Sequence, residues 1–146
     1  MFDDELNHLR HVVDAGGNAL EIDDALLPLI AHSDSRVITP ILRLLNESGD
    51  QDGMWSILHT AESFNGSAYV TGLLAVLPEL RQTSFWWSKT LVIRILNSAT
   101  CSADLIHQLH GAPAPMKEAV SAICEKINED ARFHTKTAPV LAASMK

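Results

Sequence analysis

Apolar residues recur at intervals of three or four along almost the whole chain, a spacing that places them on one face of an α-helix. The first run is Phe2, Leu6, Leu9 and Val13, and the acidic residues that follow Phe2 suit the positive end of a helix dipole. No segment shows the strict apolar and polar alternation of a half-buried strand. The sequence therefore predicts an all-α fold.

This periodicity predicts about seven or eight helices in antiparallel pairs, with polar or glycine-containing loops between them. The expected helices cover approximately residues 2–14, 20–32, 34–46, 53–61, 68–81, 85–97, 102–110 and 116–130. The helix at 85–97 is apolar almost all round its axis, so we expect it to be buried on most sides. Residues 131–146 contain three basic residues, no acidic residue and Pro139, and we expect them to form a loosely attached or extended tail.

Prolines interrupt three of the apolar runs, at Pro28, Pro40 and Pro78. A proline inside a helix removes a backbone hydrogen bond, so these helices should be kinked or should begin or end nearby. Kinked helices in antiparallel pairs are typical of an α-solenoid of the HEAT or armadillo kind.

A weak internal repeat favours the same architecture. The segments 26–27 and 44–46, Leu-Leu and Leu-Leu-Asn, resemble segments 73–74 and 95–97, Leu-Leu and Ile-Leu-Asn, at offsets of 47 and 51 residues. Helical repeats of this class have periods of about 40–47 residues. An irregular helical bundle is the alternative.

Negative charge is concentrated in the first third of the chain. Residues 1–52 contain 11 acidic and three basic residues, whereas residues 53–146 contain seven and eight, which together give the net charge of −7. An acidic domain repels a phosphate backbone, which argues against direct binding to nucleic acid and favours a basic protein partner. The length of 146 residues predicts a single domain, with acidic helices at 1–52, a near-neutral body at 53–130 and a basic tail at 131–146.

Several features predict a cytoplasmic protein that does not enter membranes. The first residues, MFDDEL, lack the basic and apolar regions of a secretory signal, and no apolar run approaches the ~20 residues that cross a bilayer. Cys101 and Cys124 show no CxxC spacing, and two cysteines are too few for a disulfide framework. We expect both to be reduced thiols.

The sequence offers little support for catalysis. His8 and His11, like His107 and His110, are three residues apart on one helix face, but neither pair has a third ligand at a recognisable spacing. There is no nucleophile motif, phosphate-binding glycine loop or dinucleotide fingerprint. We therefore expect no catalytic residue, no metal and no cofactor, with a metal hydrolase or a helical-repeat nucleic-acid enzyme as the rival hypothesis.

Two aromatic groups are candidates for protein recognition. Trp55, His59 and Glu62 fall on one helical stripe, where they can form a recognition patch or edge the core. In the cluster Phe85-Trp86-Trp87, successive side chains point about 100° apart, so they cannot all face one core. Trp87 aligns with Leu91 and should be buried, which leaves Trp86 as the interface candidate.

A family resemblance is carried by the central part of the chain. The stretch from Trp55 to Phe64 has the pattern W-x-x-L-H-x-x-E-x-F, and the stretch from Arg94 to Ser98 reads R-I-L-N-S. Over about residues 40–130 the chain resembles the Immunity protein 30 family, all-α proteins found beside bacterial polymorphic and contact-dependent growth inhibition toxins. The resemblance implies a cytosolic protein that binds a cognate toxin domain and neutralises it without catalysis, with the acidic third largely outside the resemblance.

The leading hypothesis is an immunity protein whose acidic surface engages a basic toxin domain, plausibly a nuclease, and blocks its active site or substrate access. A HEAT-like scaffold or adaptor with another partner is the alternative. A negative surface steers a basic partner and accelerates association. The predicted partner-binding residues are Asp3, Asp4, Glu5, Asp14, Glu21, Asp23, Asp24, Trp55, His59, Glu62 and Trp86.

Overall fold

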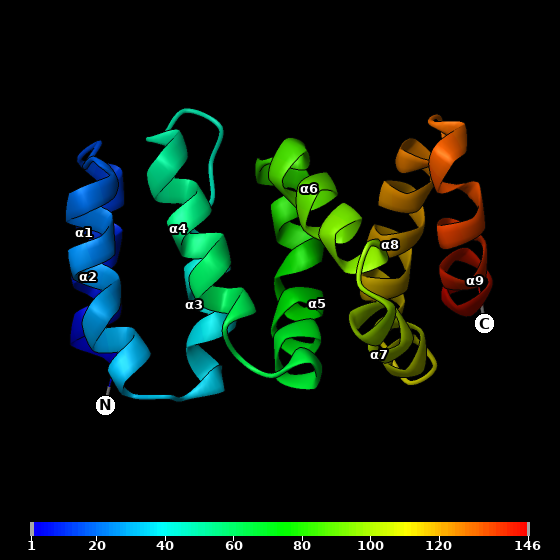
Figure 1. Ribbon diagram of the computed structural model, residues 1–146, viewed down its shortest axis with the longest axis horizontal. Coiled ribbons are helices and arrows are strands. Elements are labelled where there is room, and N and C mark those ends of the chain that lie inside the picture. The colour runs from blue at the N-terminus through cyan, green and yellow to red at the C-terminus, as the bar shows by residue number, and fades with distance from the viewer. Residues whose placement is uncertain (1, 146) are drawn as a thin grey trace. The chain divides into compact units, whose positions relative to one another are not determined.

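The computed structural model describes residues 2–145, and all regular elements in that range are helical (Figure 1). The all-α prediction is confirmed, with nine α-helices over these residues, one more than the upper end of the expected number. The helices are α1 (Asp3–Asp14), α2 (Ala19–Ala31), α3 (Ile38–Leu42), α4 (Gln51–Glu62), α5 (Gly66–Thr83), α6 (Phe85–Leu96), α7 (Ala99–Leu109), α8 (Ala114–Ile127) and α9 (His134–Ser144), with 3-10 turns η1 (Ser35–Val37) and η2 (Ala131–Phe133).

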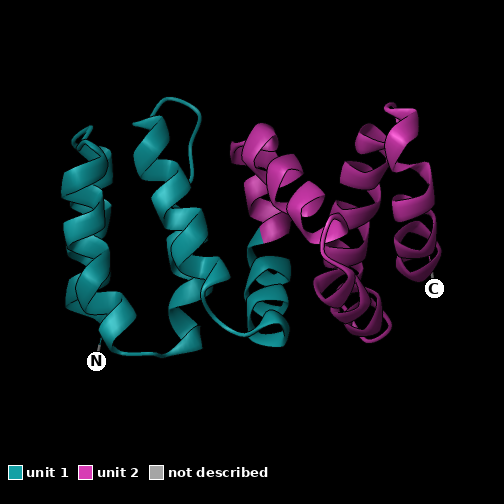
Figure 2. Ribbon diagram, viewed as in Figure 1, with its two compact units in different colours: residues 1–76 teal, residues 77–146 magenta. Residues whose placement is uncertain are grey.

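The chain divides into two compact units, residues 1–76 and 77–146, with the boundary inside α5 (Figure 2). In unit 1, α2 packs against α1 and α4, and α3 packs against α4. In unit 2, α9 packs against α7 and α8, and α6 also contacts both of these helices. Unit 1 contains 12 acidic and three basic residues and unit 2 contains six and eight, so their formal charges are −9 and +2.

The order and spacing of the helices repeat along the chain. Helices α1, α4 and α7 begin 48 residues apart, at residues 3, 51 and 99, and α2, α5 and α8 begin at residues 19, 66 and 114. Two pairs of equivalent N-termini, those of α2 and α5 and those of α4 and α7, share their capping chemistry, whereas α1 and α8 have no side-chain cap. The side chains of Asn18 and Asn65 each accept a bond from the backbone N–H three residues later, as do those of Asp50 and Ser98. Equivalent positions can therefore be compared between copies, while a solenoid form stays a prediction.

The third expected helix, 34–46, is shorter than predicted. Residues 35–37 form η1, and the α-helix covers only Ile38–Leu42. Pro40 lies in the first turn of this helix, where a backbone N–H has no partner within the helix. In a longer helix, a proline at an interior position would remove a hydrogen bond. Beyond the helix, Asn46 Oδ1 accepts the backbone N–H of Ser48 at 3.1 Å, which stabilises a turn in place of further helix.

Both 3-10 turns begin with the same Asp-x-Arg arrangement. Asp34 accepts the backbone N–H of Arg36 at 2.9 Å and its guanidinium Nη2 at 2.6 Å, and Asp130 does the same with Arg132 at 3.0 and 2.6 Å. These hydrogen bonds favour the charged carboxylate, and they lower the pKa of Asp34 and of Asp130 to about 2. Each pair fixes the chain reversal that leads into the following helix.

The prediction of a loose or extended tail at 131–146 is wrong for the described residues of that segment. They form η2 and then α9, whose buried residues are Thr137, Val140, Ala143 and Ser144. Thr137 Oγ1 donates to Asn128 Oδ1 at 2.6 Å, which satisfies its buried hydroxyl. Pro139 lies on the exposed side of α9 and does not prevent the opposite side from packing.

A close approach of two backbones within unit 1 depends on Gly72. Thr39 Oγ1 donates to the Gly72 carbonyl at 2.8 Å, and a Cβ at Gly72 would meet Ile38 Cγ2 at 2.5 Å and Ile38 Cβ at 2.8 Å. Ile38 is fully buried, so it has little room to move. The first turn of α3 therefore reaches α5 only because residue 72 has no side chain.

We predict that Gly72→Ala destabilises the fold, because overpacking a close contact costs about 1–3 kcal/mol, against about 1 kcal/mol gained in helix propensity. Urea unfolding should show a net loss of about 1 kcal/mol, the middle of the range of about 0–2 kcal/mol that these two terms leave. The control is Gly111→Ala, where a Cβ has no heavy atom within 4 Å. Equal stability of the two variants would contradict the tight α3 to α5 contact.

We also predict a pH-dependent contribution from the Asp-x-Arg turns. A carboxyl with a folded-state pKa of about 2 and an ordinary value of 3.8 stabilises the fold above pH 4 and loses this effect as the pH falls toward 2. The melting temperatures of the wild type and Asp130→Asn should differ most at pH 7 and converge near pH 2. Asp24→Asn, in the exposed middle of α2, is the control, and a gap for Asp130→Asn that persists at pH 2 would argue against the ionic contribution.

Candidate protein-binding surfaces

Unit 1 carries the predicted acidic residues on two helices that pack against each other, α1 and α2 (Figure 1). Six of the seven carboxylates are on exposed residues, namely Asp3, Asp4, Asp14, Glu21, Asp23 and Asp24. They are accompanied on these helices by a single arginine, Arg10. The sequence prediction therefore places a strongly negative surface on one compact unit.

Two of the predicted acidic residues have structural partners. Glu5 Oε1 lies 3.1 Å from His32 Nε2, and this hydrogen bond lowers the pKa of Glu5. The contact ties α1 to the residue that ends α2. Glu21 completes a capping box with Asn18, in which each side chain accepts the other's backbone N–H at 3.0–3.1 Å. Both residues therefore stabilise local structure, whatever they contribute to the surface charge.

The sequence analysis missed an apolar surface on α2. Leu20, Leu27 and Ile30 are 69%, 61% and 42% exposed, although all three are large aliphatic residues. The opposite side of α2 faces its neighbours through four buried residues, Ile22, Ala25, Leu26 and Leu29. We call the three exposed residues the α2 stripe. The available signal was that α2 has apolar residues on both sides, more than one packed stripe requires.

The row predicted on α4 is present in the structure. The rings of Trp55 and His59 stack with their centroids 5.9 Å apart and an interplanar angle of 28°, and His59 Nδ1 lies 3.4 Å from Glu62 Oε1. A separation of 3.4 Å is long for a hydrogen bond, so the His59–Glu62 contact is weak. Trp55 is half-buried and His59 is exposed. The row offers an aromatic surface with polar edges, which is suited to protein recognition.

The two tryptophans of α6 are placed as the helical angle predicts. Trp87 is 2% exposed and Trp86 is 44% exposed, with the ring of Trp86 edge-on to Trp87 at 4.8 Å. Trp86 belongs to unit 2, whereas the other predicted binding residues belong to unit 1. Because its indole is exposed, Trp86 remains a candidate for contact with a protein partner.

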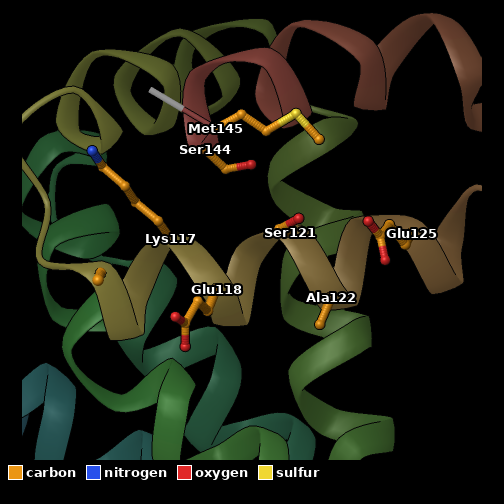
Figure 3. A pocket seen from close by; sticks show the side chains of 8 residues that line it. Lys117, Glu118, Ser121, Ala122, Glu125, Ser144 and Met145 are labelled. Atoms are coloured by element: carbon orange, nitrogen blue, oxygen red, sulfur yellow. The ribbon is translucent and has the colours of Figure 1, made fainter.

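A shallow cavity of about 440 Å³ lies between α8 and the end of α9 in unit 2 (Figure 3). Its lining mixes Lys117 with Glu118 and Glu125, and Ser121 points toward the Ser144–Met145 end of α9. The opposite charges partly cancel, and the cavity is open to solvent.

Three further features bear on the predicted chemistry. Within residues 2–145, no group of three or more His, Cys, Asp or Glu side chains is placed to hold a metal ion. In the same range, no helix is long and apolar enough to cross a membrane. Burial raises the pKa of the Cys124 thiol to about 12, which keeps it protonated and unreactive at neutral pH.

The family assignment comes from comparison with known families. The sequence profile of the family described as Immunity protein 30 matches residues 10–105, about two thirds of the chain. The chain belongs to the Immunity protein 30 family. No similar sequence was found among curated proteins, and no similar fold was found among solved structures.

The range of the Immunity protein 30 match corrects the expected extent of the resemblance. We expected residues 40–130, with the acidic third largely outside, but the match begins at residue 10 and therefore includes the end of α1, residues 10–14, and all of α2. It ends within α7, so α8 and α9 lie beyond it. The α2 stripe and four of the predicted acidic residues, Asp14, Glu21, Asp23 and Asp24, therefore lie within the matched range, whereas Asp3, Asp4 and Glu5 precede it.

We predict opposite outcomes for the two adjacent tryptophans of α6. Trp87→Ala removes a buried indole and should cost about 3–5 kcal/mol of unfolding free energy, whereas Trp86→Ala should cost about 1 kcal/mol or less. Urea unfolding followed by circular dichroism measures both. Similar losses for the two variants would show that Trp86 is part of the core and would remove it as an interface candidate.

Proposed function

We propose that this chain neutralises a basic toxin domain, a nuclease of the contact-dependent growth inhibition type, by covering its active site or its substrate path. Membership of the Immunity protein 30 family implies an immunity protein with a toxin as its protein partner. The basic character of that toxin, the cytoplasmic location and the absence of catalysis belong to the proposal. The observation that supports a basic partner is the difference in formal charge, which is −9 on unit 1 and +2 on unit 2.

The segregation of charge supports a basic partner for a physical reason. Like charges gathered on one surface repel one another and destabilise the folded state, so a mixed surface would be more stable. On α1 and α2, exposed carboxylates beyond the first helical turn, such as Asp14, Asp23 and Asp24, are present in spite of this cost. A negative surface repays the cost when it must attract a positive partner quickly, because steering raises association rates.

A nuclease fits this surface better than other toxin classes. An enzyme that cleaves nucleic acid must attract a phosphate backbone, and it does so with lysine and arginine around its active site. The exposed carboxylates of unit 1 present negative charge of the same sign as the substrate. An immunity protein of this kind competes with nucleic acid for the basic surface without itself binding nucleic acid.

We predict that the paired reversal Asp4→Lys and Asp14→Lys slows association with the cognate toxin domain, sought first in the product of the gene directly upstream, by about tenfold at low salt. Stopped-flow fluorescence at a series of salt concentrations measures the rate. The difference should vanish near 1 M salt, where the screening length falls to about 3 Å. The wild-type chain should also restore growth to cells that express the toxin domain.

The matched control reverses the same amount of charge on unit 2, with Glu118→Lys and Glu125→Lys, and should change the rate by about twofold or less. Equal effects of the two pairs would show that net charge matters and that unit 1 has no special role. A wild-type chain that neither binds the toxin domain nor protects the cells would overturn the proposed function. A scaffold or adaptor would then be the remaining hypothesis.

A further inference from the structure

The α2 stripe is an uncovered apolar surface within an acidic helix. Leu20, Leu27 and Ile30 are spaced seven and three residues apart, so they lie on one side of α2, away from the side that packs on α1 and α4. Three large aliphatic side chains gathered on one exposed side are unusual for a helix surface, since such groups gain free energy when they leave water.

Comparison with the next copy of this helix shows that the same positions can be covered. Helix α5 follows α2 at an offset of 47 residues, so Leu27 and Ile30 correspond to Leu74 and Leu77. Leu74 is 3% exposed and Leu77 is fully buried, whereas Leu27 and Ile30 are open. These positions therefore take part in packing in one copy and face solvent in the other.

The charges around the stripe select the partner that can cover it. Asp23 and Asp24 lie between Leu20 and Leu27, and α2 contains no lysine, arginine or histidine. A second copy of this chain would bring aspartates against aspartates in the low-dielectric contact, which disfavours self-association. A partner with an apolar patch ringed by lysine or arginine would satisfy both parts of the surface.

The backbone of α2 leaves one carbonyl without its usual donor four residues later. Pro28 lies inside the helix and has no N–H, so it cannot donate to the carbonyl of Asp24 four residues earlier. That carbonyl and the Asp24 carboxylate come from a single residue between Leu20 and Leu27. The exposed Asp24 carboxylate can accept from a guanidinium or ammonium group of a partner, and bonds of this charge-assisted kind are the stronger ones.

We propose that the α2 stripe, together with Asp23 and Asp24, is the surface on which the toxin domain docks, with the leucines and Ile30 as apolar anchors and the aspartates as the ionic rim. This inference rests on the proposed function and specifies the site. Anchors of this kind control the dissociation rate, whereas rim charges control the association rate. The two groups of residues therefore predict different kinetic effects.

The test uses the full chain and the toxin domain encoded directly upstream, with binding kinetics measured by surface plasmon resonance. Leu27→Gln with Ile30→Gln should raise Kd by about tenfold or more, mainly through faster dissociation. Asp23→Asn with Asp24→Asn should slow association and reduce its dependence on salt. All four positions are exposed, so melting temperatures should stay close to the wild-type value.

The control variant is Met145→Gln, which removes an apolar side chain that is 73% exposed directly after α9, outside the docking surface. It should leave Kd unchanged. Unchanged binding by Leu27→Gln with Ile30→Gln, beside a wild-type chain that binds and protects, would overturn the docking surface and leave the proposed function intact. A wild-type dimer in sedimentation that the same double variant dissolves would overturn it in favour of a second copy.

Discussion

The packing of apolar stripes between neighbouring helices is the constraint on which the rest of this structure depends. Each helix is short, and helices of this length are stable only when tertiary contacts cover their apolar side. In unit 1, α2 meets that requirement by packing against α1 and α4, and α3 approaches α5 at the side-chain-free Gly72. The buried side of α2 meets this requirement with four residues, Ile22, Ala25, Leu26 and Leu29. The α2 stripe is not needed for this packing and remains exposed to solvent. What a helix does not use for packing is then available for binding.

The acidic residues divide between local structure and surface charge. Asp34 and Asp130 hold their arginine partners two residues later and shape the turns that start α3 and α9. Glu5 links α1 to the end of α2 through His32, and Glu21 caps its own helix with Asn18. Asp23 and Asp24 lie in the exposed middle of α2, beyond the first turn where the helix dipole favours negative charge. Their presence on the open side of α2 therefore has no evident stabilising role, which is the pattern expected of residues retained for a partner.

The sequence predicted most of the fold, and its errors have identifiable physical causes. Local periodicity was sufficient for α1, α6 and the order of the other helices, and the 100° helical angle correctly separated Trp86 from Trp87. The prediction of a loose tail in the last segment, 131–145, was wrong for a physical reason. Pro139 lies on the exposed side of α9, so it does not prevent Val140 and Ala143 from packing. The i, i+4 and i+7 spacing did bring Trp55, His59 and Glu62 together. The sequence does show apolar residues on both sides of α2, but it does not show which side stays exposed, because that depends on which helices pack beside α2.

The repeated helix order gives this exposure a further consequence. The same two positions are part of the core in α5, as Leu74 and Leu77, and part of the surface in α2, as Leu27 and Ile30. Substitutions at Leu27 and Ile30 therefore alter the surface without disturbing the side of α2 that holds unit 1 together. Specificity for one partner over another is a difference between two binding free energies, and it changes most readily where side chains can vary without loss of stability. On the proposed docking surface, a family of immunity proteins can match new partners by changing exposed residues of one helix while the buried stripe keeps the fold.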